Sequence, residues 1–310
     1  MSARELIVLG TASQVPTRYR NHNGYFLRWD AEGFLFDPGE GTQRQMIVPG
    51  VTASMITRIC ITHFHGDHCL GFASIVQRIS LDRVPHTVHA YYPGSGQVYY
   101  DRLRRASIFH DVAAVEPHPI KQAGPILKTK ELTLSTLPLD HGVEAWGYRI
   151  QEPDTRTMLP EKLEALGIRG PAIGALIRAG SCEVDGRTVR LDEVSVHKPG
   201  QSVAFIMDTR PCENALTLAR GVDLLICEST YLSEDAERAW SNGHMTARDA
   251  ATLAREAGAG KLVLTHFSQR YPSTGAFLEE ARPIHGDVVA ARDGDVIAVP
   301  KRRGLADDPE

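Results

Sequence analysis

The chain has 310 residues, which is long enough for one large domain or two and for a sizeable hydrophobic core. Its 42% hydrophobic and 23% charged content is typical of a soluble globular protein, and no apolar stretch approaches the length of a transmembrane helix, so we expect no membrane contact. The formal net charge of −4 excludes binding of nucleic acid through a broad basic field, and any RNA contact must therefore be local.

Short apolar strands alternate with helical patterns along the chain. The run from Leu6 to Leu9 is too short for a signal sequence and predicts a first strand. Further strands are expected at 24–28, 33–37, 56–62, 87–90 and 132–138, with helices at 70–81 and 95–107. The second half predicts strands at 202–208, 223–228 and 261–265, and a helix at 246–257 with Thr246 as its N-cap and Gly258 as its stop. This pattern indicates a mixed α/β fold, which we interpret as a single domain over residues 1–310.

The cysteines indicate a reducing compartment. They are odd in number, scattered, and include no Cys-x-x-Cys pair: Cys60, Cys69, Cys182, Cys212 and Cys227. Such usage favours free thiols over a disulfide framework. We therefore expect a cytoplasmic protein.

Residues 152–198 interrupt the regular alternation and predict an inserted arm. This segment is rich in Pro and Gly, and only Pro160 to Leu166, ended by Gly167, has a clear helical pattern. A connection of this length is either functional or disordered. Within it, residues 167–178 contain Arg169 and Arg178 but no acidic residue, which suits contact with phosphates. A solvated insertion without a partner is an equally acceptable interpretation.

The run His63-Phe64-His65-Gly66-Asp67-His68 follows an apolar stretch and predicts metal binding. His63 and His65 are two residues apart, so in an extended segment they project to the same side and can bind one ion. Gly66 can supply the turn that directs Asp67 and His68 toward a second ion. Zinc is the default for such ligands, while iron and manganese stay open. The alternative is a polar loop with surface histidines.

Further ligand candidates follow apolar strands far away in the sequence. His141 comes after Leu139-Asp140, Asp208 closes the strand from Ser202, and His266 ends the run from Lys261. Each alone is acceptable as a core residue with its hydrogen bonds satisfied. Because sites in layered α/β folds collect at strand ends, the repeated placement favours a shared metal site.

Over nearly its whole length the sequence resembles the metallo-β-lactamase superfamily and, within it, the ribonuclease Z family. The histidine run marks only the superfamily, whereas the other motifs and the inserted arm after Tyr148 are more specific. These motifs are Pro16-Thr17-Arg18-Tyr19-Arg20-Asn21, Asp37-Pro38-Gly39-Glu40-Gly41-Thr42-Gln43, Pro138-Leu139-Asp140-His141-Gly142, Asp208-Thr209-Arg210, Glu228-Ser229-Thr230, His244-Met245-Thr246 and Thr265-His266-Phe267-Ser268.

The resemblance implies an αββα sandwich with an inserted flexible arm and a dinuclear centre of two Zn²⁺ per subunit, without an organic cofactor. By analogy the ligands fall into three sets: His63, His65 and His141 for one ion, Asp67, His68 and His266 for the other, and Asp208 as the bridge. Two such ions can activate water and hold a phosphodiester for in-line displacement.

The activity implied by the resemblance is removal of the 3′ trailer from precursor tRNA, leaving a 3′-OH on the tRNA and a 5′-phosphate on the trailer. Asp67 is expected to orient or deprotonate the water, and His244, steadied by Glu228, to protonate the leaving ribose oxygen. Ser268 and Arg270 are candidates for phosphate contact, although an Arg after a strand is usually a solvated charge. A homodimer is expected because relatives pair and offer the arm to a neighbouring protomer.

Two residues depart from the family pattern. Met207 stands where the family commonly has Gly, and it would be strained if the backbone there needed an unusual dihedral angle. Cys227 replaces the His that usually precedes Glu228, so one contact around the centre is expected to be lost or altered. Thr209 and Arg210 are expected to support Asp208.

Three functions therefore compete. The favoured one is the precursor-tRNA endonuclease, in which the arm reaches the folded body of the substrate. The second is a hydrolase of a small ester, sulfate or phosphodiester with the same fold and metals. The third is a non-catalytic RNA-binding relative, which missing ligands would favour, but all seven are present.

Overall fold

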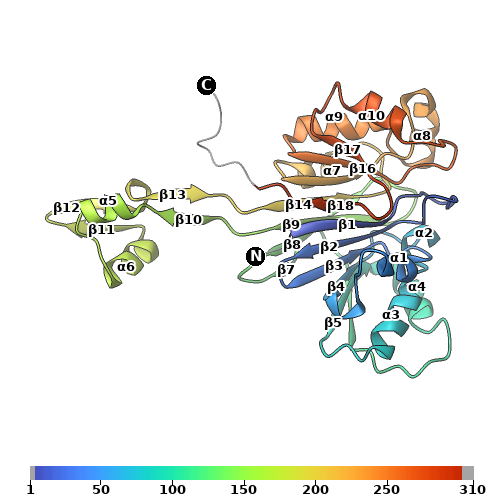
Figure 1. Ribbon diagram of the computed structural model, residues 1–310, viewed down its shortest axis with the longest axis horizontal. Helices are drawn as coiled ribbons and strands as arrows, with labels where there is room; N and C mark the ends of the chain where they lie inside the picture. Colours follow the sequence, from blue (N-terminus) through green and yellow to red (C-terminus); the bar gives the residue numbers. More distant parts are fainter. Residues whose placement is uncertain (1–3, 302–310) are drawn as a thin grey trace.

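Two seven-stranded sheets pack face to face with helices on both outer sides (Figure 1). The computed structural model describes residues 4–301. The first sheet has the order β18 (Val296–Ala298), β1 (Arg4–Gly10), β2 (Gly24–Trp29), β3 (Glu32–Phe36), β4 (Arg58–Cys60), β5 (Val88–Pro93) and β6 (Val115–Ile120). The second has the order β17 (Val288–Ala290), β16 (Lys261–Thr265), β15 (Leu224–Glu228), β14 (Ser202–Ile206), β9 (Ala145–Gln151), β8 (Thr133–Leu139) and β7 (Gly124–Lys128). The mixed α/β prediction is confirmed.

Helices cover the outer face of each sheet. On the side of the first sheet lie α1 (Thr42–Ile47), α2 (Gly66–Cys69), α3 (Phe72–Leu81) and α4 (Gln97–Arg104). On the side of the second lie α7 (Glu213–Ala219), α8 (Ala236–Asn242), α9 (Ala247–Ala257) and α10 (Gly275–Ala281). Within residues 4–301, no helix has the length and apolar composition needed to cross a bilayer.

Apolar side chains fill the space between the two sheets. Phe36 of the first sheet stacks on Phe205 of the second with ring centroids 4.5 Å apart, and Tyr25 meets Phe205 edge-on at 5.2 Å. All three side chains are buried, and each contributes roughly 1.5–3 kcal/mol through burial. This packing fixes one sheet relative to the other, and hence the loops that extend from both.

Helix α9 forms where its sequence predicts. Thr246 accepts a hydrogen bond from the backbone of Asp249, whose carboxylate bonds back to Thr246, and Gly258 ends the helix with φ 62°. Ala250 and Ala254, four residues apart, are fully buried against the second sheet. Both predicted ends of this helix are confirmed.

Several elements differ from the prediction. The strand expected at 56–62 covers only 58–60, and beyond its end Thr62 donates hydrogen bonds to the carboxylate of Asp37. The helix expected at 95–107 covers only 97–104. Other elements had no prediction, either because they are short or because their sequence lacks a clear period: β6, β7, β9, β17, β18, α1, α7, α8 and α10.

The inserted segment forms a folded arm that projects from the sandwich (Figure 1). Its two connecting strands, β10 (Thr155–Met158) and β13 (Ser195–Lys198), pair antiparallel. Beyond them lie α5 (Pro160–Ala165), α6 (Pro171–Ala179) and the hairpin of β11 (Ser181–Val184) and β12 (Arg187–Arg190). The arm has its own buried cluster, formed by Leu163, Ile168, Leu176, Val189 and Val194. The helix at Pro160 is confirmed, whereas α6 was missed.

Candidate metal centre

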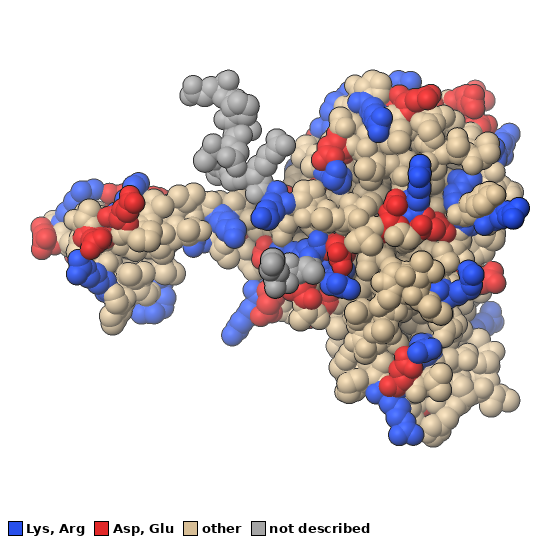
Figure 2. Space-filling model, viewed as in Figure 1, with Lys and Arg blue, Asp and Glu red and all other residues tan. Residues whose placement is uncertain are grey.

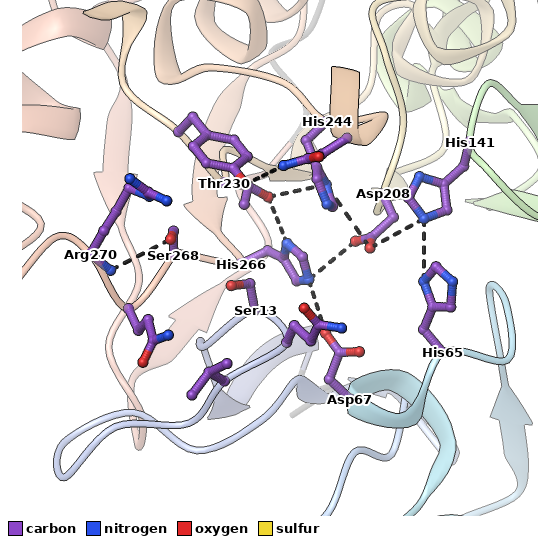
Figure 3. Close-up of a pocket in the computed structure, with 15 residues that line it drawn as sticks. Ser13, His65, Asp67, His141, Asp208, Thr230, His244, His266, Ser268 and Arg270 are labelled. Atoms are coloured by element: carbon purple, nitrogen blue, oxygen red, sulfur yellow. Dashed lines mark hydrogen bonds and ion pairs between the residues drawn. The ribbon is translucent and has the colours of Figure 1, made fainter. Parts of the chain in front are cut away.

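Seven side chains that the sequence singles out as metal ligands converge at one end of the two sheets, and Figure 3 labels five of them. His63 and His65 lie in the loop after β4, Asp67 and His68 on α2, and His141, Asp208 and His266 after β8, β14 and β16. The three distant residues thus each follow a strand and lie beside the histidine run.

The short helix α2 is held in place by a close backbone contact. A Cβ on Gly39 would lie 2.2 Å from the carbonyl oxygen of Asp67, so the turn after β3 can approach only with glycine at this position. The N–H of Gly71 donates to the carbonyl of Pro38 at 2.8 Å. The Asp37-Pro38-Gly39 turn thereby fixes the direction of Asp67 and His68.

The first group of donor atoms comes from three histidines. His63 Nε2 lies 2.9 Å from His65 Nδ1, which lies 3.3 Å from His141 Nε2. A tetrahedral ion with bonds of roughly 2.0–2.1 Å holds its donor atoms about 3.4 Å apart. These spacings therefore suit one ion.

The second group is built on α2 and the loop after β16. His68 Nε2 lies 3.2 Å from His266 Nε2 and 3.3 Å from Asp67 Oδ2. The Nε2 atom of His266 is 3.5 Å from the same Asp67 oxygen. The donor atoms of these three residues are therefore also about 3.4 Å apart, as one tetrahedral ion requires.

Asp208 lies between the two groups. Its Oδ2 is 3.5 Å from His63 Nε2 and 3.3 Å from His68 Nε2, and its Oδ1 is 3.2 Å from His266 Nε2. The side chain is buried, yet Oδ1 has no hydrogen-bond partner. A buried carboxylate oxygen without a donor is costly unless a cation balances it. The residues present thus fit a divalent metal.

Two side chains and one backbone carbonyl contact the ring nitrogens that face away from the centre. Asp37 Oδ2 lies 2.8 Å from His68 Nδ1, the carbonyl of Gly243 lies 2.9 Å from His141 Nδ1, and Thr230 Oγ1 lies 2.7 Å from His266 Nδ1. Such partners fix ring orientation and leave the opposite nitrogen for metal. Sequence reasoning assigned no role to Asp37 or Thr230, although both belong to quoted motifs.

The electrostatics of the centre favour the ionised form of Asp208. Burial raises the pKa of Asp208, but His266 and His68 lower it by more, and the net result is far below its usual range. Burial and neighbouring His68 both lower the pKa of His63, which favours the neutral ring needed for a ligand. Burial lowers the pKa of His68, but Asp208 and Asp67 raise it well above its ordinary value.

His244 and Glu228 form a second layer beside Asp208. His244 Nδ1 lies 2.9 Å from Glu228 Oε1 and 4.0 Å from Asp208 Oδ2. Glu228 also accepts hydrogen bonds from the backbone of Thr209 and the hydroxyl of Thr230. Burial lowers the pKa of His244, but Glu228 and Asp208 raise it to about 9, and a divalent cation nearby would act in the opposite direction.

A cleft of about 360 Å³ opens onto this centre (Figure 3). Besides the metal-binding side chains, Ser268, Arg270 and His244 line it. The structure therefore brings these three predicted residues to the centre. Arg169 and Arg178 lie elsewhere, exposed on the arm.

The two departures from the family pattern are core residues. The positive φ falls on Asp208, at 35°, and not on Met207, whose side chain is buried between the sheets without the expected strain. Cys227 is buried between the second sheet and its helices. Thr209 contacts Glu228 rather than Asp208, and Arg210 pairs with Asp140 at 3.1 Å, beside His141.

Comparison with known proteins identifies the family. The metallo-β-lactamase superfamily profile matches residues 17–146, and a β-lactamase superfamily domain profile matches residues 188–267. A ribonuclease Z from Nocardia farcinica is 57% identical over 98% of this chain and 100% of its own length. The chain belongs to the ribonuclease Z family. A ribonuclease Z from Streptomyces coelicolor is 55% identical over the same shares.

A solved structure supports the fold. The crystal structure of the short form of human tRNase Z superposes with a TM-score of 0.70 at 24% identity, covering 96% of this chain and 99% of that one. With this likeness and the superfamily profile, the αββα metallo-β-lactamase fold predicted from the sequence is confirmed. The His/Asp clusters of such a fold hold a divalent metal.

Asp37→Asn tests the outer contact to His68. The amide is nearly isosteric but presents no charge to His68 Nδ1, so we expect metal affinity to fall by about 10–100-fold. Metal content after dialysis against graded chelator measures this, with Asp82→Asn on the surface as control. Wild-type retention of metal by Asp37→Asn would contradict the orienting role of Asp37.

Proposed function

We propose that the protein is a metal-dependent endoribonuclease that removes the 3′ trailer from precursor tRNA. The observation that most supports this proposal is the full-length match to relatives named ribonuclease Z. The match extends through the arm as well as the metal centre. A match of this extent favours the nuclease over a hydrolase of small esters, which would share only the fold and metals. The intact set of seven donor side chains disfavours a non-catalytic relative.

Two Zn²⁺ per subunit are the metals that we propose. His63, His65 and His141 would hold one ion and Asp67, His68 and His266 the other, with Asp208 between them. Imidazole and carboxylate donors at these spacings suit zinc. Bound there, zinc would activate water and offset the negative charge of the phosphodiester.

His244 is our candidate general acid, and Glu228 positions it. Its Nδ1 contacts Glu228, so Nε2 is the nitrogen left to protonate the departing ribose O3′. Water adds to phosphorus as the P–O3′ bond breaks, and the proton from Nε2 completes the 3′-OH of the tRNA. The trailer then carries the 5′-phosphate. Asp67, which lines the cleft, is our candidate for orienting the attacking water.

Ser268 and Arg270 are proposed to contact the phosphate. Both line the cleft immediately after the metal-binding His266. The Arg270 guanidinium lies over the ring of Tyr231, 5.8 Å from its centroid, which restricts its orientation. Such a cation can receive the phosphodiester as it enters.

The arm over residues 152–198 is proposed as the contact to the folded body of the tRNA. Figure 2 shows Lys and Arg together with Asp and Glu on it, and several arginines are paired with acids, among them Arg187 with Glu193 at 2.5 Å. The arm is therefore not basic as a whole. Arg169, before α6, and Arg178, in its last turn, are exposed and are our candidates for contact with phosphates, and Arg169 also pairs with Glu164 at 3.4 Å.

A homodimer and a cytoplasmic location complete the proposal. Ile47 and Val48, at the end of α1, are 72% and 78% exposed, and adjoin a groove that includes Met46 and Val51. Apolar side chains at such a groove suit a second copy of the chain. All five cysteines are free thiols, which suits a reducing compartment.

The decisive experiment maps both product ends. The zinc-loaded protein should cut a labelled precursor tRNA once, leaving a 3′-OH on the tRNA and a 5′-phosphate on the trailer. Asp208→Ala should abolish cleavage because it removes the carboxylate shared by both groups. A small phosphodiester cleaved efficiently by a protein that leaves precursor tRNA intact would refute the assignment.

His244→Ala tests the general acid. We expect a fall in kcat of about 10²–10⁴-fold with metal content unchanged, because His244 contacts Glu228 and lies outside the seven-residue set. Single-turnover cleavage and metal analysis measure the two effects. His285→Ala, outside the cleft lining, is the control. Loss of zinc from His244→Ala would instead make His244 a ligand.

Shortening the arm tests substrate recognition. Residues 157–196 are replaced by Asn-Gly, which joins the paired positions Arg156 and His197 and keeps the Arg4–Glu152 ion pair. We expect cleavage of a small chromogenic phosphodiester to persist while kcat/KM for precursor tRNA falls at least about 100-fold.

A milder variant combines Arg169→Ala with Arg178→Ala. It should raise KM for precursor tRNA and leave KM for the small phosphodiester unchanged. The control, Arg255→Ala with Arg282→Ala, removes the same charge from exposed positions outside the arm. If the shortened protein lost activity equally on precursor tRNA and on the small phosphodiester, the arm would have no role in recognising tRNA.

A further inference from the structure

A third group of metal-binding side chains lies away from the centre described above. His89 on β5 pairs in register with Glu116 on β6, and Tyr91 pairs with His118. Register partners and residues two apart share one face of a sheet, so His89, Glu116 and His118 project together. Tyr91 belongs to the core between the sheets, which identifies this face as the inner one, at the edge strand β6.

This group lies at the other end of the strands from the catalytic cleft. Arg58, the first residue of β4, is the register partner of His89, whereas His63 and His65 follow the last residue of β4. None of the three side chains lines the cleft. The proposed endonuclease mechanism makes no use of them.

The three potential donor atoms have the spacing of a metal site. His89 Nδ1 lies 2.9 Å from His118 Nε2 and 3.4 Å from Glu116 Oε2, and His118 Nε2 lies 3.6 Å from Glu116 Oε1. The separation of His63 and His65 in the catalytic centre is also 2.9 Å. Tetrahedral coordination requires separations of about 3.4 Å, so small rotations of the rings suffice.

The surroundings orient the ligands without closing the site. His118 stacks on buried Tyr91 with centroids 4.8 Å apart and planes at 19°, which fixes its ring. Arg58, the nearest cation by register, is ion-paired with Glu32, so its charge is largely balanced. The side chains of His89, His118 and Glu116 are 34%, 33% and 54% exposed. Solvent can therefore occupy a fourth coordination position.

We propose that His89, Glu116 and His118 bind a zinc-class divalent ion, distinct from the catalytic metals. Two imidazoles and one carboxylate suit Zn²⁺, Ni²⁺ or Cu²⁺. The alternative is a hydrogen bond between the neutral imidazoles of His89 and His118, with Glu116 nearby. That alternative uses the same two nitrogens, so metal binding and the hydrogen bond exclude each other.

The ion would clamp the edge strand β6 to its neighbour. Pro117 and Pro119 lack backbone N–H groups, and β6 is the edge strand, paired in the sheet with β5 alone. An ion that binds only the folded state stabilises it in proportion to its occupancy. Its effect is therefore expected on the stability of β6 rather than on catalysis.

Zinc binding to the holoenzyme tests the site. Protein already holding its catalytic zinc is titrated with Zn²⁺ by calorimetry and its metal content is counted after equilibrium dialysis. We expect one further equivalent per chain in the wild type, none in His118→Ala, and at least about tenfold weaker binding in Glu116→Gln. His110→Ala, an exposed histidine outside the group, should retain the equivalent.

Two further measurements guard against misfolding of a variant. Added zinc should raise the Tm of the wild type and of His110→Ala, raise that of Glu116→Gln less, and leave that of His118→Ala unchanged. It should also slow hydrogen exchange of β6 amides in the wild type. Cleavage of precursor tRNA should be unchanged in all these variants. Equal zinc uptake by wild type and His118→Ala, or no further uptake by the wild type, would overturn the proposal.

Discussion

The carboxylate of Asp208 lies between two sets of imidazoles, and the need to balance its charge constrains the whole centre. Asp37, Asp67 and Glu228 are buried close by, and buried carboxylates persist only when cations or hydrogen-bond donors compensate them. The outward ring nitrogens of His68 and His266 already have partners, so their Nε2 atoms face Asp208. That arrangement requires loops from both sheets to meet at one end, which the aromatic packing between the sheets secures.

The centre was largely predictable because each ligand has a local signal. The histidine run is dense in donors, and His141, Asp208 and His266 each follow an apolar strand. The supporting contacts were not predictable, because the pairing of Asp37 with His68 depends on how the turn after β3 packs on α2. The register between distant strands likewise decides which side chains are neighbours, and it depends on how whole strands pack rather than on a local motif.

The fold was predictable where a segment is periodic and capped, as in α9, or continuously apolar, as in β16. It was not predictable where a segment contains residues that disfavour the helix or strand it forms. Pro117 and Pro119 disfavour a strand, yet β6 lies at the edge of its sheet, where the missing N–H groups are tolerated. Gly174 disfavours a helix, yet α6 forms because Pro171 begins it and Leu176 anchors it in the core of the arm.

The arm joins the sandwich through only two paired strands and carries its own small core. Few apolar contacts of the sandwich therefore depend on what lies beyond β10 and β13. A lineage can lengthen, trim or exchange such an appendage without disturbing the chemistry at the far end of the molecule. The choice of RNA and the act of cutting it are in this sense free to evolve at different speeds.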